Sequence, residues 1–343
     1  IIKFTGVDEA ISLNKVHLQL TNTASSSASD ITQLTLWDGA TQVGSAVFTG
    51  DNTTATATIS NFVIPKDGSK KMTIKADFPE IGTGKPITVG GHFISVDYDG
   101  GELTETNGTG QQSGDSVNSS TATDSASAGV RLFKSIPTIQ KVALSSSALS
   151  NGSSKVLARW KVGADSKGDV GVSKFTLTFA TTTAVLSAVN VYAYYDSGYS
   201  NPVTGLYDGS GTFLPTTVDM TTNWVDSTTQ FDFTANNSSS ASTTIQIPAG
   251  STIYFEAKGT VAGSAAGASI TITLNGDSAY MTNGFTNHSL YTAGAAMLDD
   301  NDTHDDFLWS SNATQTPSGI EDGDFANGYG IMTSDSITET LSQ

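Results

Sequence analysis

The chain has 343 residues, enough for two domains of ordinary size, and its 33 acidic and 16 basic residues give a formal net charge of −17. This charge repels phosphate backbones and argues against a nucleic-acid partner. There is no cysteine, which excludes disulfides and thiolate chemistry, and no apolar run approaches the roughly 18 residues of a membrane span.

The first residues alternate as a β-strand does, and they begin without an initiator methionine or signal peptide, as in a processed, truncated or trimmed product. Alternation returns at 16–20, 34–37 and 43–48, and Asp38-Gly39 between the last two is a strong hairpin signal. His17 alternates out of its strand and is expected to face solvent. A strand at 93–98 ends the first predicted domain, residues 1–104.

The segment that follows is rich in Ser, Thr, Gly and Asn. Between residues 102 and 129 it has no aromatic residue, and Leu103 and Val117 are its only larger aliphatic residues. Such a segment buries too little apolar surface to offset its ordering entropy by itself. We therefore predict a linker or long loop over residues 105–130, with a linker as the preferred interpretation.

The second predicted domain, residues 131–343, repeats a feature of the first. Ile64-Pro65 and Ile247-Pro248 each lead through a Gly-Ser turn into an alternating strand, about 180 residues apart. Further strands are expected at 156–162, 175–179, 189–195 and 270–274, followed by a less regular C-terminal extension. Many short strands without helices predict an all-β chain of two tandem Ig-like antiparallel β-sandwiches joined by a Ser/Thr/Gly-rich linker.

A resemblance rests on three stretches: Arg131 to Pro137, Ala158 to Phe179 with its Gly168-Asp169-Val170, and the C-terminal part from Trp309 to Gln343. They resemble the C-terminal part of large secreted surface proteins of ultra-small candidate-phylum bacteria, over roughly residues 131–343, and the first domain resembles the modules before it. The resemblance implies tandem β-sandwiches similar in composition to surface-layer proteins, further modules before Ile1, and Gln343 as the natural C-terminus.

Two acidic groups are the candidate metal ligands. Five carboxylates within eight residues repel one another unless they are solvated or bridged by a cation, and calcium accepts six to eight oxygens. The predicted ligands of a structural calcium are Asp299, Asp300, Asp302, Asp305 and Asp306, with Asp322 and Asp324 as a second contribution. The group does not follow the EF-hand pattern, and a solvated acidic loop remains the alternative.

One concentration of aromatic residues stands out: Tyr192, Tyr194, Tyr195, Tyr199 and Tyr207. Such rings serve as cross-strand pairs, as interface residues or as platforms for sugars, and the sequence leaves these three interpretations open. No nucleophile with a properly spaced histidine and carboxylate is present, so an enzyme is not expected.

These observations favour a structural subunit of an extracellular cell-surface assembly, either a surface layer or a filament. Copies of the chain are the expected partners, joined by sandwich packing and by strand addition through the segment Ile1, Ile2, Lys3, Phe4 and Thr5. The alternative is an adhesin or carbohydrate-binding module that uses the tyrosines to hold cell-wall or surface glycans. Asn-x-Ser/Thr sequences also permit glycosylation.

Overall fold

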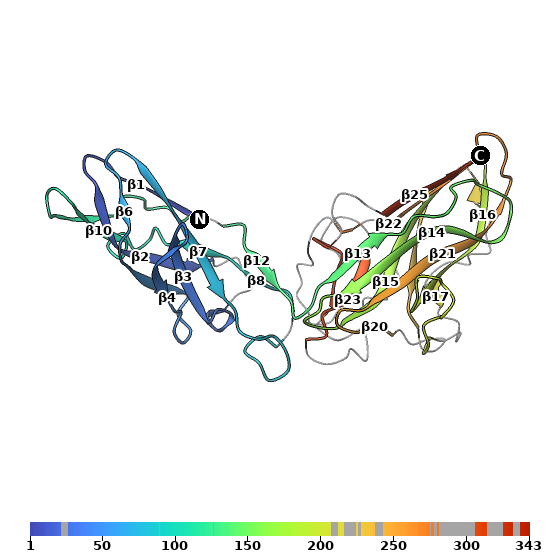
Figure 1. The fold of residues 1–343 in the computed structure, drawn as a ribbon, viewed down its shortest axis with the longest axis horizontal. Helices are drawn as coiled ribbons and strands as arrows, with labels where there is room; N and C mark the ends of the chain where they lie inside the picture. The colour runs from blue at the N-terminus through green and yellow to red at the C-terminus, as the bar shows by residue number, and fades with distance from the viewer. Residues whose placement is uncertain are drawn as a thin grey trace. The chain divides into compact units, whose positions relative to one another are not determined.

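A computed structural model describes the chain in detail except for residues 22–26, 89, 126, 207–211, 216–223, 226–227, 237–242, 275, 278–279, 281–305, 314–324 and 332–336. The described part is all-β, as the sequence predicts, and its only helical element is the 3₁₀ turn η1 (Ala28–Asp30). In this part of the chain no helix is long and apolar enough to cross a membrane. The chain divides into two compact units, Ile1–Phe133 and Lys134–Gln343, coloured blue to green and green to red in Figure 1.

Unit 1 is built from antiparallel strands on one hydrogen-bonded path, β1-β7-β3-β4-β5-β2-β10-β11. Only two residue pairs join β4 to β5, Gly44 with Ile59 and Ser45 with Thr58, so the path turns there into two layers, β1-β7-β3-β4 and β5-β2-β10-β11. The strands are β1 (Ile2–Thr5), β2 (Ile11–Leu20), β3 (Gln33–Asp38), β4 (Thr41–Ala46), β5 (Thr54–Ile59), β6 (Val63–Ile64), β7 (Ser69–Asp77), β8 (His92–Ile94), β9 (Val96–Tyr98), β10 (Asn107–Gly110), β11 (Ser116–Asn118) and β12 (Val130–Leu132).

The core of unit 1 follows from the period-two pattern of its strands. Leu34 and Leu36 of β3 and Val16 and Leu18 of β2 are fully buried, and they belong to one apolar cluster between the two layers. Alternate residues of a strand point to opposite faces, so one face of each strand enters the core. At full burial each of these side chains contributes about 1.5–3 kcal/mol.

The segment 105–130, for which we preferred a linker, lies within unit 1. Residues 107–110 and 116–118 form the hairpin β10–β11, and β10 pairs with β2. Glycine makes this pairing possible, because a Cβ on Gly108 would lie 2.7 Å from both Ile11 Cγ2 and the Ser12 carbonyl oxygen. The segment gains its order from the sheet that it joins, which composition alone does not reveal. The division between units falls after Phe133, close to the predicted start at residue 131.

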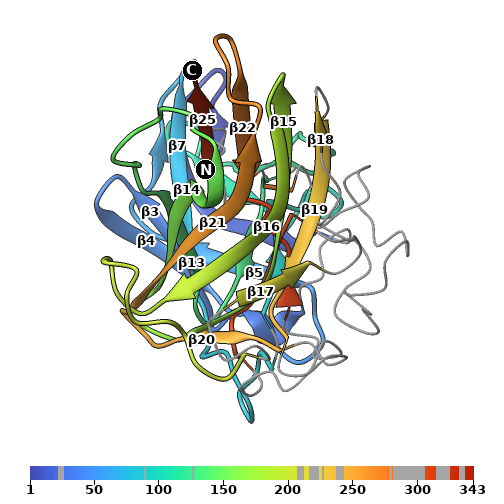
Figure 2. The ribbon, with the colours of Figure 1, turned by 90° about the vertical axis from the view of Figure 1, so that its right-hand side faces the viewer.

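The strands of unit 2 also follow one hydrogen-bonded path, on which β17 links two sheets by pairing with both β16 and β19. One contains β13, β14, β21 and β16 in that order, and the other is centred on β15, which pairs with β19, β20, β22 and β23. Figure 2 shows β21 between β14 and β16. The strands are β13 (Pro137–Lys141), β14 (Gly152–Ala164), β15 (Val170–Thr182), β16 (Val185–Tyr194), β17 (Thr212–Pro215), β18 (Trp224–Val225), β19 (Thr228–Thr234), β20 (Ile245–Ile247), β21 (Thr252–Ala262), β22 (Ser269–Leu274), β23 (Phe307–Ser310), β24 (Phe325–Ala326) and β25 (Ile337–Ser342).

A chain of aromatic rings fills the core of unit 2. Trp160 of β14 stacks on Phe255 of β21 at 5.9 Å between ring centroids and meets Phe175 of β15 edge-on at 5.2 Å. Phe175 in turn stacks on Phe307 of β23 at 5.3 Å. All four side chains are fully buried, so the rings link strands of both sheets.

Both Ile-Pro turns form where the sequence predicts them, but the predicted hairpins do not, because β6 pairs with β2 and β20 pairs with β15 instead of with the strand that follows each turn. Residues 63–64 and 69–77 make β6 and β7, and residues 245–247 and 252–262 make β20 and β21. Each turn places one residue at positive φ, Asp67 at 50° and Gly250 at 70°. β7 and β21 therefore hold equivalent places after the same turn, and each is an inner strand of its sheet with a neighbour on both sides.

Asp30 of η1 gives unit 1 an acid-sensitive contact. Burial acts to raise the pKa of this carboxyl, but the hydrogen bonds with His92 (3.1 Å) and the Ser27 amide (2.8 Å) outweigh it and leave the pKa below its ordinary value. A carboxyl whose pKa is lower in the folded chain than in the unfolded chain stabilises the fold at pH values above its unfolded-state pKa. This stabilisation is lost as the pH falls through the folded-state pKa.

We expect Asp30→Asn to lower the free energy of unfolding of unit 1 by about 1–2 kcal/mol at neutral pH, because the charge-assisted hydrogen bonds weaken. The difference from the wild-type chain should shrink in acid. Urea unfolding at neutral and acidic pH measures both values, and an equal difference at the two pH values would contradict this role.

Candidate functional site

Strand β1, the predicted assembly segment, is paired on one side only among the described residues. It pairs with β7 in the register Ile2 with Met72, Lys3 with Lys71 and Phe4 with Lys70. The amide of Gly6 donates to the carbonyl of Gly68 at 2.9 Å in the same register. In an antiparallel pair every second residue exchanges hydrogen bonds with its partner, so Ile2, Phe4 and Gly6 bond to the β7 side. The backbone groups of Lys3 and Thr5 consequently point away from β7.

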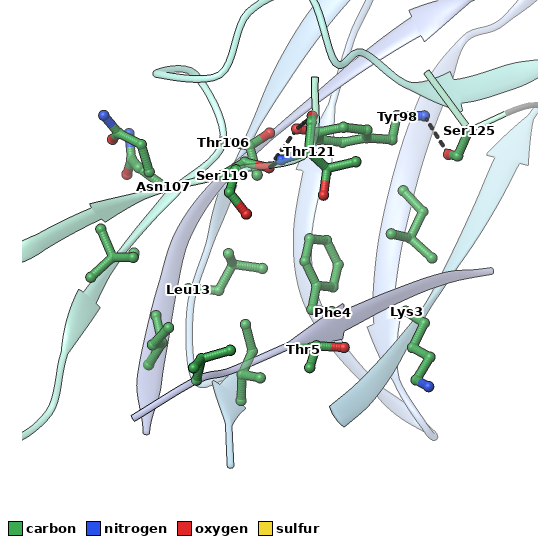
Figure 3. A pocket seen from close by; sticks show the side chains of 18 of the residues that line it. Lys3, Phe4, Thr5, Leu13, Tyr98, Thr106, Asn107, Ser119, Thr121 and Ser125 are labelled. Atoms are coloured by element: carbon green, nitrogen blue, oxygen red, sulfur yellow. Dashed lines mark hydrogen bonds between the residues drawn. The ribbon is translucent and has the colours of Figure 1, made fainter. Parts of the chain in front are cut away.

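A groove of about 560 Å³ borders this free edge and opens the unit between its two layers. Ile2 and Phe4 of β1, Leu13 of β2 and Ile64 of β6 contribute its apolar side. Figure 3 shows Phe4 pointing into the space below Tyr98, whereas Lys3 points away from it. Ile1 and Val7 precede and follow β1 in the chain, and their side chains are 83% and 66% exposed. The groove is therefore also lined by apolar side chains that are open to solvent.

The opposite wall of the groove is polar and comes from the end of β11 and the chain beyond it. The Tyr98 hydroxyl lies 2.6 Å from Ser119 Oγ and 3.0 Å from the carbonyl oxygen of Thr121, which ties this wall to β9 (Figure 3). Ser119 donates its amide to Thr106 at 2.8 Å in the register of the β10–β11 hairpin. By the same alternation the backbone of Asn118 points away from β10. The groove thus lies between two sheet edges.

Positive charge is concentrated beside the groove. Lys3 and Lys71 are opposite each other on β1 and β7, and both are exposed. Lys70 has a partner in Asp38 at 2.6 Å, but no carboxylate among the described residues is paired with Lys3 or Lys71. Like charges on facing residues of neighbouring strands repel each other, so this edge favours an approaching negative charge.

The tyrosine concentration lies elsewhere, on the outer face of the β14-β21-β16 sheet. Tyr192 and Tyr194 alternate on β16, and the register places them beside Glu256 and Tyr254 of β21. After β16 the chain turns back, and the carboxylate of Asp196 accepts hydrogen bonds from the amides of Gly198, Ser200 and Asn201. This turn holds Tyr199 at a φ of 55° and brings its ring against Tyr194 and Tyr254, at 5.6 and 6.1 Å between centroids.

Two cations and a buried carboxylate complete this cluster. Glu256 is 1% exposed and accepts hydrogen bonds from Arg159 Nε and Nη2 at 3.1 and 3.0 Å. Lys258 pairs with the same carboxylate, and its ammonium also donates to the Tyr194 hydroxyl at 3.2 Å. Arg159 lies over the ring of Tyr199 at 3.9 Å, and Lys258 lies over the ring of Tyr192 at 4.9 Å.

This geometry favours packing over sugar binding for the described tyrosines. Tyr194 is buried, Tyr199 is half-buried, and a cation of the chain itself covers a ring face of Tyr192 and of Tyr199. A sugar platform needs such a ring face free. Tyr195 is 46% exposed, and the predicted Tyr207 lies outside the described residues.

The Tyr199 hydroxyl provides a test of this packing role. It is buried without a hydrogen-bond partner among the described residues, and burial raises the pKa of Tyr199 to about 12. Tyr199→Phe should leave the free energy of unfolding unchanged or raise it by up to about 1 kcal/mol, because no hydrogen bond is lost. An alkaline absorbance titration of this variant should lack the tyrosine step at about pH 12, which the control Tyr195→Phe should keep. A clear loss of stability in Tyr199→Phe would reveal a bonded hydroxyl instead.

Most of the predicted calcium ligands, namely Asp299, Asp300, Asp302, Asp305, Asp322 and Asp324, lie outside the described residues. The remaining one, Asp306, is 3% exposed, and its amide donates to Asp277 Oδ1 at 2.8 Å. Among the described residues no three histidine or acidic side chains form a metal-binding group. Calcium binding at 299–305 and 322–324 therefore stays a prediction.

The sequence did not predict several residues that line the groove or contact the tyrosines, and it placed one histidine wrongly. His17, expected to face solvent, is 8% exposed, with its Nδ1 2.7 Å from Thr56 Oγ1 and its Nε2 3.4 Å from Asp99. Thr56 of β5 and Asp99, which follows β9, lie against the imidazole, so residues far away in the sequence bury a side chain that the alternation of β2 alone would leave exposed. The sequence also did not predict the polar wall of the groove or the Arg159–Glu256–Lys258 group. The residues of each come from strands that are far apart in the sequence and meet only in the fold.

The comparisons with known proteins show no family. No family model matches the chain, and no curated protein matches it. Solved structures with some likeness include the manganese lipoxygenase of Gaeumannomyces graminis with part of the zonadhesin of Komagataella pastoris, at 12% identity and a TM-score of 0.18, covering 79% of each chain.

Two others are streptococcal. The C-terminal domain of the Streptococcus agalactiae AgI/II polypeptide BspA is 12% identical, with a TM-score of 0.19 over 76% of this chain and 79% of that one. The C-terminal domain of the Streptococcus pyogenes antigen I/II-family protein AspA is 10% identical, with a TM-score of 0.20 over 76% and 80%. Such low TM-scores carry no argument about function.

Proposed function

We propose that the chain is a non-enzymatic structural subunit of an extracellular cell-surface assembly, a surface layer or a filament, in which copies of the chain join through the edges of their β-sandwiches. The observation that carries this proposal is the free edge of β1, whose outward backbone groups at Lys3 and Thr5 border an open groove. An unpaired edge of this kind is a template for another strand.

The cores of the two units support a structural role. Each unit has its own apolar core, and in unit 2 aromatic rings join the two sheets. The cell-surface location rests on the resemblance of residues 131–343 to secreted tandem-sandwich proteins. The glycan-binding alternative has less support, because cations of the chain occupy ring faces of Tyr192 and Tyr199.

Sedimentation and negative-stain electron microscopy of the purified chain test this proposal, over a range of concentrations and with millimolar calcium or a chelator. Ordered sheets or filaments are the expected result, and their loss in chelator would assign calcium a role in the assembly. Particles that remain monomeric at every concentration, in calcium and in chelator, would contradict it.

A further inference from the structure

Strands β15 and β19 of unit 2 carry a buried lysine and an aspartate that lie close together on one face of their sheet. Lys174 is directly opposite Thr234 in the register, and two residues further along β15 Thr176 is directly opposite Asp232. Opposite residues of an antiparallel pair share a face, so these side chains lie on the face away from the core residue Phe175. The Lys174 ammonium lies 3.7 Å from Asp232 Oδ2, and the two side chains are 7% and 17% exposed.

This pair has poor geometry for a buried salt bridge. The 3.7 Å between Nζ and Oδ2 exceeds the ~3.2 Å upper end of N–H···O hydrogen bonds. Asp232 is the one ion-pair partner of Lys174 among the described residues. A buried ion pair offsets the cost of leaving water only when its contact is close and further hydrogen bonds satisfy both charges. A neutral link between the two side chains avoids this cost.

We propose that Lys174 and Asp232 condense into an amide that joins β15 to β19 covalently. The ammonium first passes a proton to the carboxylate, which leaves a neutral amine beside a carboxylic acid. Nζ then attacks Cγ of Asp232, the Cγ–Oδ2 bond breaks, and Oδ2 leaves as water with two of the three protons of the original ammonium. The third proton stays on the amide nitrogen. The reaction needs no oxidant, reductant or other reactant.

Two threonine hydroxyls on the same face suit this reaction. Thr176 Oγ1 donates to Asp232 Oδ1 at 2.6 Å, so it stabilises the negative charge that develops on this oxygen during the attack. Thr234 is fully buried, and its hydroxyl has no hydrogen-bond partner among the described residues. Because Thr234 lies opposite Lys174, it is placed to accept a hydrogen bond from the new amide N–H. The condensation thus gives a partner to a buried hydroxyl that otherwise lacks one.

Burial favours the amide over its hydrolysis. Water is the reactant of the reverse reaction, and the side chains of both residues are largely closed to it. The link also closes a long loop, because β16, β17 and β18 lie between β15 and β19 in the chain. Closing such a loop restricts the unfolded chain, as a disulfide does, in a chain that has no cysteine. The amide therefore stabilises unit 2 without any contact between copies.

Intact-mass spectrometry of the purified chain tests this proposal. The wild-type chain should be lighter by one water molecule than the mass calculated from its sequence. Lys174→Arg should have its full calculated mass, whereas the control Lys167→Arg, at an exposed lysine, should again be one water lighter. After trypsin digestion the peptides that contain residues 174 and 232 should stay joined. A wild-type chain of full calculated mass would overturn the cross-link, as would a water loss that persists in Lys174→Arg.

Thermal unfolding provides a second measurement. Lys174→Arg should unfold several degrees below the wild-type chain, because it lacks the covalent closure, and Lys167→Arg should unfold with the wild type. If Lys174→Arg fails to fold, the wild-type mass and the joined peptides decide the question alone. None of these readouts requires the chain to assemble, so failure of the cross-link and failure of the proposed function are distinguishable.

Discussion

Replacing Glu256 with alanine should lower the free energy of unfolding of unit 2 by about 3 kcal/mol. The carboxylate is buried and pairs with both Arg159 and Lys258, so its removal leaves two cations without their partner. Breaking a buried pair costs about 3–5 kcal/mol. The Arg159 and Lys258 side chains keep 26% and 25% of their surface exposed, which places the effect at the lower end of that range.

The matched control removes all three charges together. A variant carrying Arg159→Met, Glu256→Met and Lys258→Met buries no unpaired ion, and we expect it to recover most of the lost stability. Chemical unfolding followed by circular dichroism measures both variants. A loss below about 1 kcal/mol in Glu256→Ala would show that water replaces the carboxylate and that the cluster contributes little.

Replacing Trp160 with alanine should cost unit 2 about 3–5 kcal/mol, the range for a fully buried large aromatic side chain. The indole contacts Phe175 and Phe255, so the cavity would open between the two sheets. Trp160→Phe keeps much of this contact and should cost clearly less.

The control for Trp160→Ala is Trp37→Ala in unit 1. Trp37 is only half-buried, with Lys75 4.2 Å from its ring centroid and its indole N–H donating to Thr35 Oγ1 at 2.9 Å. We expect a loss of about 1 kcal/mol, confined to unit 1. Equal losses in the two variants, measured by thermal unfolding, would contradict the central place of Trp160 in the core.

Local patterns predicted the fold correctly where the determining residues are neighbours in the sequence. The predicted hairpin at Asp38-Gly39 forms, with Asp38 paired to Thr41 and Gly39 of the two-residue loop at a φ of 60°, and the two Ile-Pro turns lead into β7 and β21. These turns need residues that tolerate a positive φ, such as glycine and aspartate. Such residues can be recognised in the sequence itself, so the turns could be predicted.

Long-range pairing decided what the sequence could not show. The hairpin β10–β11 is ordered by β2, about 95 residues earlier in the chain, through close approaches that only glycine allows. Tyr192, Tyr194 and Tyr199 were recognised as a group, but the cations that cover their rings come from β14 and β21. The segment Ile1–Thr5 was expected to add to a neighbour's sheet, and in the structure Ile2–Thr5 is paired with β7 of its own unit and offers an edge instead.

The most direct measurement is residue-resolved amide hydrogen exchange of β1 in the dilute and the assembled chain. In the dilute chain the amides of Lys3 and Thr5 should exchange fast, while those of Ile2 and Phe4 are protected by β7. On assembly the exchange of Lys3 and Thr5 should slow at least tenfold as a second strand pairs with them. Protection of both amides in the dilute chain, or unchanged exchange in the assembled one, would contradict strand addition at β1.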